Sequence, residues 1–388
     1  MGSLLTPEKA IGGLLGKIDS PLDERLKAVR WGEFKVTDIF LVKNTHNILS
    51  NEIIADSGEI PYLCASATNN AVSCYISYNI KDHEEGNCIF IGGKTFVVTY
   101  QEYDFFSNDS HNLVLYLKDS EKRTKPIQLY LVSCISKSLG HKYTWGDSIS
   151  HKKIKDDFIH LPLSSDGKID FDFMELFIRE LEEERIRELA AYLTVSGLAD
   201  ATLTASEEAA LLQFDSLEWM DFNLKYLFGK STRGKRLKGD DRIQGNLPFV
   251  TAGEANEGIS AFISNKVEIF SKNTTTIDMF GSAKYRNYDY GADDHVAVVH
   301  TENLPKHAAI FVTAACHKAA HTGKFSYSRN FYAKDADELF ISLPVKDGNP
   351  DYEIMALFIS AVQKLVIKDV VQYADQKIAA TKLIINDK

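Results

Sequence analysis

Short apolar runs fill two parts of the chain, and each part is followed by an apolar pattern of longer period. The runs are "CIFIGG", "TFVVTY", "NLVLYL" and "FIHLPL" in the first part, and "HVAVVH", "AAIFVTAA" and "LFISLPV" in the second. Runs of this length, separated by Gly, Asn, Asp and Pro, predict short β-strands. The run "IQLYLVSCISKSL" fits either a strand or a helix. With short helices packed between the strands, each part predicts an α+β fold.

Beyond each part, apolar residues recur at the spacing of one helix face. They are Met174, Ile178, Leu181, Leu189 and Leu193 in the first pattern, and Met355, Ile359, Val362, Val366, Val370 and Tyr373 in the second. Asp170 and Asp351 precede these patterns, where a carboxylate can cap the helix or complement its positive N-terminus. A second helix reaching about Ile384 needs a packing partner. We expect the helices to pair as an antiparallel coiled coil; packing of each helix on its own module is the alternative.

The chain repeats itself. "IPYLCASATNNAVSCYIS" at 60–77 aligns without gaps on "LPFVTAGEANEGISAFIS" at 247–264, and "LPLSSDGKIDFDFM" at 161–174 recurs as "LPVKDGNPDYEIM" at 343–355. Further anchors, such as "WGEF" with "WMDF" and "DSHNLVL" with "DDHVAVV", follow in the same order. Such ordered similarity indicates an internal duplication. We therefore divide the chain into an N-terminal helical segment (1–25), a first module (26–165), a central helix region (166–215), a second module (216–346) and a C-terminal helix (347–388).

Two shorter segments resemble each other just ahead of the modules. "TASEEAALLQF", at 204–214, reads as a capped helix because it begins with a Ser/Thr-x-x-Glu-like pattern. "LTPEKAIGGLL" near the N-terminus is similar to it. The repeated unit is therefore expected to include the helix that leads into each module.

Composition restricts the function. The chain has 388 residues, of which 44% are hydrophobic and 25% charged, as in soluble globular proteins. It shows no signal peptide and no apolar run of about 18 residues, so we expect no membrane association and a cytoplasmic location. Five scattered cysteines without a C-x-x-C pair indicate free thiols. The net charge of −10 disfavours nucleic acid, but "KYLFGKSTRGKRLKGDDR" at 225–242 holds seven bases and two acids.

Catalytic motifs are weak or absent. His317 and His321 have the spacing of a zinc pair, but no Glu follows the first His and no third ligand is indicated. "IGGK" at 91–94 lacks the spacing of a phosphate-binding loop and reads as a β-turn. Asp293 and Asp294 leave a hydrolytic enzyme open as a remote alternative, although "DSH" and "DDH" recur in both copies as if they were a structural turn. We therefore predict no catalytic residue and no metal, and a protein that binds and positions.

The doubled motifs resemble the specificity subunits of type I restriction–modification systems and of the related type IIB and IIG systems. The resemblance covers the chain beyond about residue 26. It is carried by Ile60-Pro61-Tyr62, Asn69-Asn70, Tyr75-Ile76, Leu161-Pro162, Gly167, Asp170 and Met174, and in the second copy by Leu247-Pro248-Phe249, Asn256, Gly258, Phe262-Ile263, Leu343-Pro344, Gly348, Asp351 and Met355.

This resemblance implies an architecture and a division of labour. Each module would be an α/β target-recognition domain for one half of a split double-stranded DNA sequence. The two helices would form a coiled-coil spacer, with pseudo-twofold symmetry, that docks DNA methyltransferase subunits. Methylation with S-adenosylmethionine, and cleavage by a restriction subunit or domain, would reside in partner chains. This chain would then need no cofactor of its own.

Polar and basic residues in the modules are the candidates for DNA contact, because such side chains read base edges or bind phosphates. In the first module they are Ser66, Thr68, Asn69, Asn70, Lys94, Lys137, Lys142 and Tyr143. In the second they are Arg233, Lys235, Arg236, Lys238, Gly253, Asn256, Lys284, Arg286 and Lys324. Asn69 and Asn256 fit a turn cap equally well. Candidate partner contacts are Met174, Ile178, Met355 and Ile359. A two-module protein-binding scaffold that does not bind DNA is the alternative function.

Overall fold

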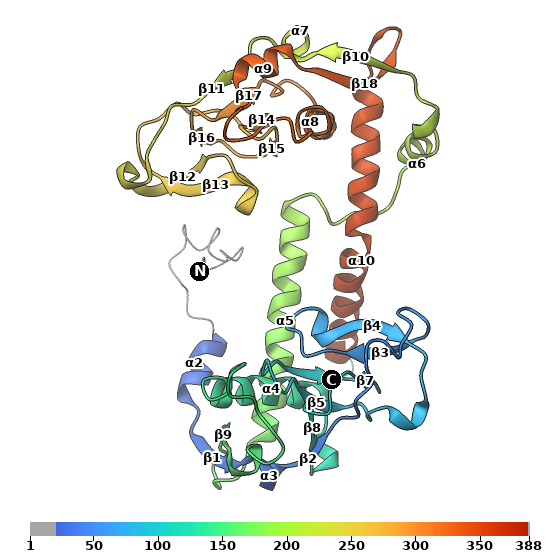
Figure 1. Cartoon of the computed structure of the whole chain (residues 1–388), viewed down its shortest axis with the longest axis vertical. Coiled ribbons are helices and arrows are strands. Elements are labelled where there is room, and N and C mark those ends of the chain that lie inside the picture. Colours follow the sequence, from blue (N-terminus) through green and yellow to red (C-terminus); the bar gives the residue numbers. More distant parts are fainter. Residues whose placement is uncertain (1–20, 387–388) are drawn as a thin grey trace. The chain divides into compact units, whose positions relative to one another are not determined.

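The computed structural model describes residues 21–386, which divide into two compact units, residues 21–188 and residues 189–386 (Figure 1). Each unit contains one module. The N-terminal segment predicted over 1–25 therefore lies mostly outside the described residues, as does the "LTPEKAIGGLL" motif. None of the described helices combines the length and the apolar character needed to cross a membrane.

Three small sheets build the first unit. Strands β1 and β9 pair with each other, β2, β8, β5 and β6 form an antiparallel sheet in that order, and β4, β3 and β7 form the third. Its elements are α2 (Pro21–Ala28), β1 (Trp31–Lys35), α3 (Val36–Ile39), β2 (Phe40–Asn44), β3 (Ile60–Leu63), β4 (Val72–Ile76), β5 (Cys88–Ile91), β6 (Val98–Gln101), β7 (Phe106–Ser107), β8 (Leu113–Leu117), α4 (Lys125–Leu139), β9 (Phe158–Pro162) and the start of α5 (Phe171–Val195).

The second unit repeats these three sheets in the same strand order, with one additional short strand, β19, beside β18. Strands β10 and β18 pair, β11, β17, β14 and β15 follow each other, and β13, β12 and β16 form the third sheet, whose β12–β16 pair is parallel like β3–β7. Its elements are α6 (Ala205–Leu212), β10 (Trp219–Asn223), α7 (Leu224–Phe228), β11 (Thr232–Arg233), β12 (Gln244–Val250), β13 (Ile259–Ile263), β14 (Thr274–Asp278), β15 (Ala283–Arg286), β16 (Gly291–Ala292), β17 (Val296–Val299), α8 (Lys306–Ala320), α9 (Ala333–Glu338), β18 (Phe340–Lys346), β19 (Asn349–Pro350) and α10 (Tyr352–Asn386). The matching topology confirms the duplication.

One helix in each module packs on the four-stranded sheet. The ambiguous run at 127–139 lies in α4, whose apolar face joins the core of the first unit. The strand predicted for "AAIFVTAA" is wrong, because this run lies in α8. Ala308, Val312 and Cys316 are buried one helical turn apart. Alanine favours helix, and Pro305 precedes the first turn, so local propensity outweighs the apparent β pattern.

The repeated Leu-Pro stretch joins the last long strand of each module to the following helix. Asp170 accepts the Phe173 N–H at 2.9 Å, and Asp351 accepts the Ile354 N–H at 3.0 Å. These bonds satisfy donors that a helix N-terminus leaves open. Both aspartates therefore cap helices, as the sequence predicted.

In the first turns of α10 the predicted face is buried, since Met355 lies in the core and Ile359 packs against it, but from Val366 onward the buried face lies one residue away from the predicted one. Val371 and Ala374 are buried, whereas Val370 and Tyr373 are exposed. In this part of α10 the buried positions are therefore shifted by one residue towards the C-terminus. Leu193, near the end of α5, packs against this face, so the two helices touch within the second unit. A coiled coil over their full lengths remains a prediction.

A short helix ahead of each module docks on the helix that follows it. Thr204 caps α6 through a reciprocal pair of bonds with Glu207, which confirms the capped helix. Glu207 also accepts a bond from Ser360 at 2.6 Å and pairs with Lys364 at 2.8 Å, both on α10. In the first unit, α2 contacts α5 through a single, partly exposed ion pair between Arg25 and Glu180. A helix therefore precedes and follows each module, but the segment predicted to match α6, "LTPEKAIGGLL", lies outside the described residues and that similarity stays a prediction.

Candidate nucleic-acid interface

Both modules place a rare left-handed turn at the tip of a β-hairpin. Between β3 and β4, the φ angles of Asn69, Asn70 and Ala71 are 49°, 50° and 68°. Between β12 and β13, Asn256, Glu257 and Gly258 have φ angles of 50°, 54° and 80°. Each non-glycine residue in this region costs about 1 kcal/mol, so the three in the first turn and the two in the second need support from their surroundings.

The two turns are closed by the same backbone bonds. Cys64 N–H donates to Ala71 O at 2.9 Å, and Thr251 N–H donates to Gly258 O at 2.8 Å. A side chain at Gly258 would meet Thr251 O at 2.6 Å, so this position accepts glycine alone without rearrangement. Asn69 Nδ2 donates to Val72 O at 3.0 Å and so supports its own turn, and both asparagines have left-handed backbones, which this residue type tolerates. Both residues remain exposed, so contact with DNA stays a prediction for them.

In the first module, three loops lie against one another around this tip. Gly92, after β5, lies so close to Ala65 that a Cβ on it would stand 2.6 Å from the Ala65 side chain. Phe96, in the same β5–β6 turn, packs on Tyr143 in the loop after α4, with 5.4 Å between ring centroids. The tip, the β5–β6 turn and the end of α4 therefore form one surface. This surface carries the exposed candidates Thr68, Asn69, Asn70, Lys94 and Lys137, and also Lys142, which is exposed but pairs with the buried Asp157.

The second module assembles the equivalent surface. Gly253 N–H donates to Asp278 Oδ2 at 3.2 Å, and this bond ties the tip to the β14–β15 turn. Ala283 N–H donates to His317 Nδ1 at 3.2 Å, and this bond ties the turn to the end of α8. Phe280 of the turn also packs on Tyr327, with 5.2 Å between ring centroids. Asn256 and Lys324 are exposed here.

Charge separates the two modules. Residues 232–246, which precede and enter β12, contain five bases and two acids, whereas the aligned residues 45–59 contain three acids and neither Lys nor Arg. We call 232–246 the basic loop. Arg236 lies 3.8 Å from Asp294, and Arg242 stacks over Phe249 at 5.1 Å, so both ends of the loop are attached to the module. Arg233, Lys235, Arg236 and Lys238 are exposed and available to phosphates.

The Asp–x–His turns beside these surfaces are structural but electrostatically different. Burial favours a raised pKa for Asp109, but hydrogen bonds from His111 and Lys94 outweigh it and lower the pKa. Burial and the neighbouring Asp294 carboxylate raise the pKa of Asp293. Asp293, Asp294 and His295 place ligand atoms within 4.8 Å of one another. Since Asp109 and Asp293 both close a turn before a strand, the repeat explains the cluster without catalysis.

Burial removes three candidate residues, Tyr143, Lys284 and Arg286, from direct contact with DNA. Tyr143 is buried and donates its hydroxyl to Asp157, which also pairs with Lys142. Arg286 is only 1% exposed and donates to Thr276 Oγ1 at 2.9 Å. Lys284 is largely buried between Glu254 and Asp278. Sequence gives the charge of a side chain but not its burial, so Tyr143 and Arg286 are corrected to structural roles.

The candidate partner contacts also need correction. Met174 and Met355 are fully buried in the cores of their own modules. Ile178 and Ile359 pack against the same cores. The first turns of both helices therefore hold module to helix. Apolar spacing alone does not distinguish such an anchor from a partner surface.

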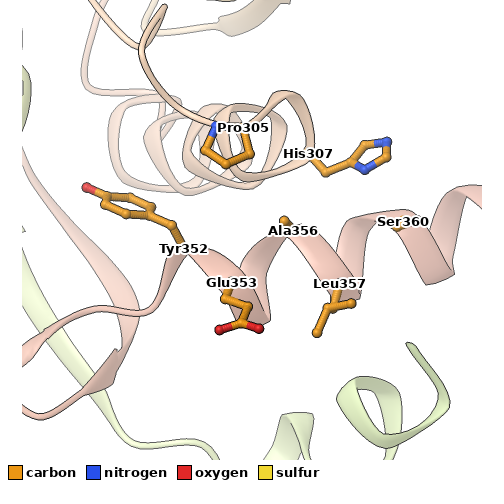
Figure 2. A pocket seen from close by; sticks show the side chains of 7 residues that line it. All are labelled: Pro305, His307, Tyr352, Glu353, Ala356, Leu357 and Ser360. Atoms are coloured by element: carbon orange, nitrogen blue, oxygen red, sulfur yellow. The ribbon is translucent and has the colours of Figure 1, made fainter. Parts of the chain in front are cut away.

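A groove of about 440 Å³ lies at the opposite end of α8 from His317 (Figure 2). Figure 2 shows Pro305 and His307 at the start of α8 facing the first turns of α10. Its lining residues are Pro305, His307, Tyr352, Glu353, Ala356, Leu357 and Ser360. Because α8 rises roughly 20 Å along its 15 residues, the groove is not part of the surface around the hairpin tip.

The described modules can now be compared with known proteins. The type I restriction modification DNA specificity domain matches residues 28–191 and again residues 216–382. The specificity subunit of the type II restriction enzyme BcgI from Heyndrickxia coagulans is 25% identical over 347 residues, which cover 87% of this chain and 96% of that protein. The S subunit of a type I restriction-modification system from M. genitalium has a similar fold, with a TM-score of 0.62 at 16% identity over 92% of this chain and 95% of that one. The chain therefore belongs to the type I restriction modification DNA specificity family, as a specificity subunit with two DNA specificity domains.

Proposed function

We propose that the chain reads a bipartite double-stranded DNA target, one half with each module, and positions a partner methyltransferase on it. One observation carries this proposal. Two modules of the same topology present the same three-loop surface but fill it with different polar side chains. A shared scaffold with divergent surface residues is what two different half-sites require, because base edges are distinguished by their donor and acceptor patterns.

As a specificity subunit, the chain is the non-catalytic part of a restriction–modification enzyme. In our proposal, α5 and α10 are the spacer that sets the separation of the half-sites and receives the partner chains. A methyltransferase subunit would bind S-adenosylmethionine and methylate the DNA, and a restriction subunit or domain would cleave it. The complex would work in the cytoplasm, where its DNA lies.

The decisive experiment is a module exchange in the complex with a methyltransferase subunit. Residues 26–165 are replaced by the corresponding module of another specificity subunit, and methylated adenines are mapped by sequencing. We expect a two-part motif in the parent protein and a change in only one of its halves in the chimera. A change in both halves, or in neither, contradicts the assignment of one half-site to each module.

A binding assay distinguishes this proposal from a protein scaffold. Duplex binding through phosphates releases counterions, so the affinity must fall steeply as salt is raised. Affinity that does not depend on salt, or no duplex binding by the assembled complex, contradicts the proposal.

A further inference from the structure

Two buried side chains occupy matching positions beside the left-handed turns. Gln101 ends β6 and pairs in register with Cys88 of β5. Arg286 ends β15 and pairs in register with Thr274 of β14. Since β5–β6 and β14–β15 are equivalent hairpins, Gln101 and Arg286 hold the same place in the two modules. The sequence did not single out Gln101, because a lone glutamine near a predicted strand belongs to no motif and its burial cannot be seen in the sequence.

Each side chain donates to the equivalent backbone carbonyl of its own module. Gln101 Nε2 donates to the carbonyl of Asn70 at 3.0 Å, and Arg286 Nη1 donates to the carbonyl of Glu257 at 2.8 Å. Asn70 and Glu257 are the middle residues of the two left-handed turns. The donors are 4% and 1% exposed, so they hold each turn from inside the module.

Each donor is itself held in place. Gln101 Nε2 also donates to Thr99 Oγ1 at 2.9 Å, and the Asn70 side chain donates to Tyr100 O at 3.0 Å. Arg286 donates through Nε to Thr276 and lies over the Tyr290 ring at 5.9 Å. A different residue type therefore does the same task in each module. This is the pattern expected when the backbone position of the turn matters more than the chemistry of its support.

What the turns expose differs. The first presents Asn69 and Asn70, and the second presents Asn256 and Glu257, all of them exposed. The amide nitrogens of Asn69 and Asn70 each donate one bond to the module, to Val72 O and Tyr100 O, which leaves the second amide hydrogen and the amide oxygen of each for a base. Asparagine can pair with the N6 and N7 edge of adenine, and glutamate can accept from the N4 amino group of cytosine. Such recognition needs side chains on a rigid support, because a small displacement removes the hydrogen bonds that discriminate between bases.

We propose that the left-handed turns at 69–71 and 256–258 are base-reading tips and that Gln101 and Arg286 are the positioning residues that hold them. This inference rests on the proposed function and adds which residues determine specificity within each half-site. It assigns Arg286 to DNA recognition through the backbone of Glu257, not through direct contact with DNA.

The test uses the complex with a methyltransferase subunit and maps methylated adenines for each variant. Arg286→Met keeps the size of the side chain and removes the donor. We expect it to lower discrimination by about tenfold or more at one or more base pairs of the second module's half, with the other half unchanged. Gln101→Met is expected to do the converse. Arg286→Gln, which introduces the residue of the first module, should retain discrimination.

An exposed variant covers the case in which Arg286→Met fails to fold. Glu257→Gln leaves the core untouched and should change the preferred base at a position within the same half. As a control for mere destabilisation, Thr275→Val removes the buried Thr275–Thr313 bond of 2.6 Å, which lies on the opposite face of β14 from Thr276 and Arg286. It should lower the melting temperature and leave the motif intact.

The outcomes separate the two proposals. If the parent complex shows no two-part motif, the proposed function fails. If the parent motif is present but Arg286→Met slows methylation equally at all sites, or Glu257→Gln leaves the motif unchanged, the positioning role is wrong. Loss of discrimination in both halves with Arg286→Met would also overturn it.

Discussion

At the residue scale, burial decides what each charged side chain does. Glu207 illustrates this, since it is 4% exposed and is held by Thr204, Ser360 and Lys364. Burial favours a raised pKa for Glu207, but the hydrogen bonds from these partners outweigh it and lower the pKa to about 2. The charged carboxylate therefore stabilises the docking of α6 on α10.

We expect Glu207→Gln to destabilise the second unit by about 1–3 kcal/mol at pH 7, because a buried ion pair loses one partner. The pKa of Glu207 is lower in the folded chain than its ordinary value of 4.5. The contribution of Glu207 to the free energy of unfolding is therefore fully present above pH 4.5 and is lost as the pH falls towards 2. Urea unfolding at pH 7 and pH 3 measures this. The variant should lose less stability between these pH values than the parent, whereas Glu208→Gln, at an exposed neighbour, should behave like the parent.

The residue scale also shows where sequence reasoning succeeds. Asp170 and Asp351 were predictable because helix caps depend on a few adjacent residues. Arg286 and Tyr143 were not, since their burial depends on strands and loops that meet only in the fold. Gln101 was missed for the same reason: its role appears only when Asn70, 31 residues away, is brought to it.

At the element scale, the duplication made the topology predictable and left local errors. Strands β5, β8 and β17 were correctly expected from short apolar runs. The strand predicted at 308–315 was wrong because a helix buried on a sheet also reads as a continuous apolar run. The buried face of α10 was correctly predicted at Met355 and Ile359 and was wrong by one residue further along, because Val366 and Val370 extend the same spacing on the exposed side.

The corrected seam can be tested by two matched substitutions on α10. Val371 is 7% exposed and packs with Leu193, whereas Val366 is 77% exposed. We expect Val371→Asn to destabilise the second unit by roughly 2 kcal/mol, since it buries a side-chain amide without a hydrogen-bond partner. Val366→Asn should stay within about 0.5 kcal/mol of the parent. Thermal unfolding of the free chain measures both effects. If Val366→Asn destabilised the chain more than Val371→Asn, the originally predicted face would be correct.

At the scale of the whole molecule, the two modules share a framework but not an electrostatic character. The net charge of −10 conceals the basic loop of the second module. Composition alone would have argued against DNA, and only the distribution of charge along the chain favours it. The duplication thus places an equivalent three-loop surface in each module. The side chains that differ between the two surfaces give the modules different roles.

The basic loop should dominate the salt dependence of DNA binding. Lys235→Ala and Lys238→Ala should each reduce the slope of log affinity against log salt by about 1, without altering the recognised motif. Lys81→Ala, an exposed lysine of the first module outside its three-loop surface, is the control and should leave the slope unchanged. Titration of labelled duplex at several salt concentrations measures these slopes. Equal slopes for the parent and the loop variants would remove the loop from the interface.

This uneven charge has a consequence in time. A positive segment accelerates diffusional encounter with a polyanion, whereas a segment rich in carboxylates does not. We therefore expect the second module to land on DNA first and to retain the complex while it slides. The first module then inspects the sequence that passes it, so that arrival and verification are separate steps carried out by different halves of one chain.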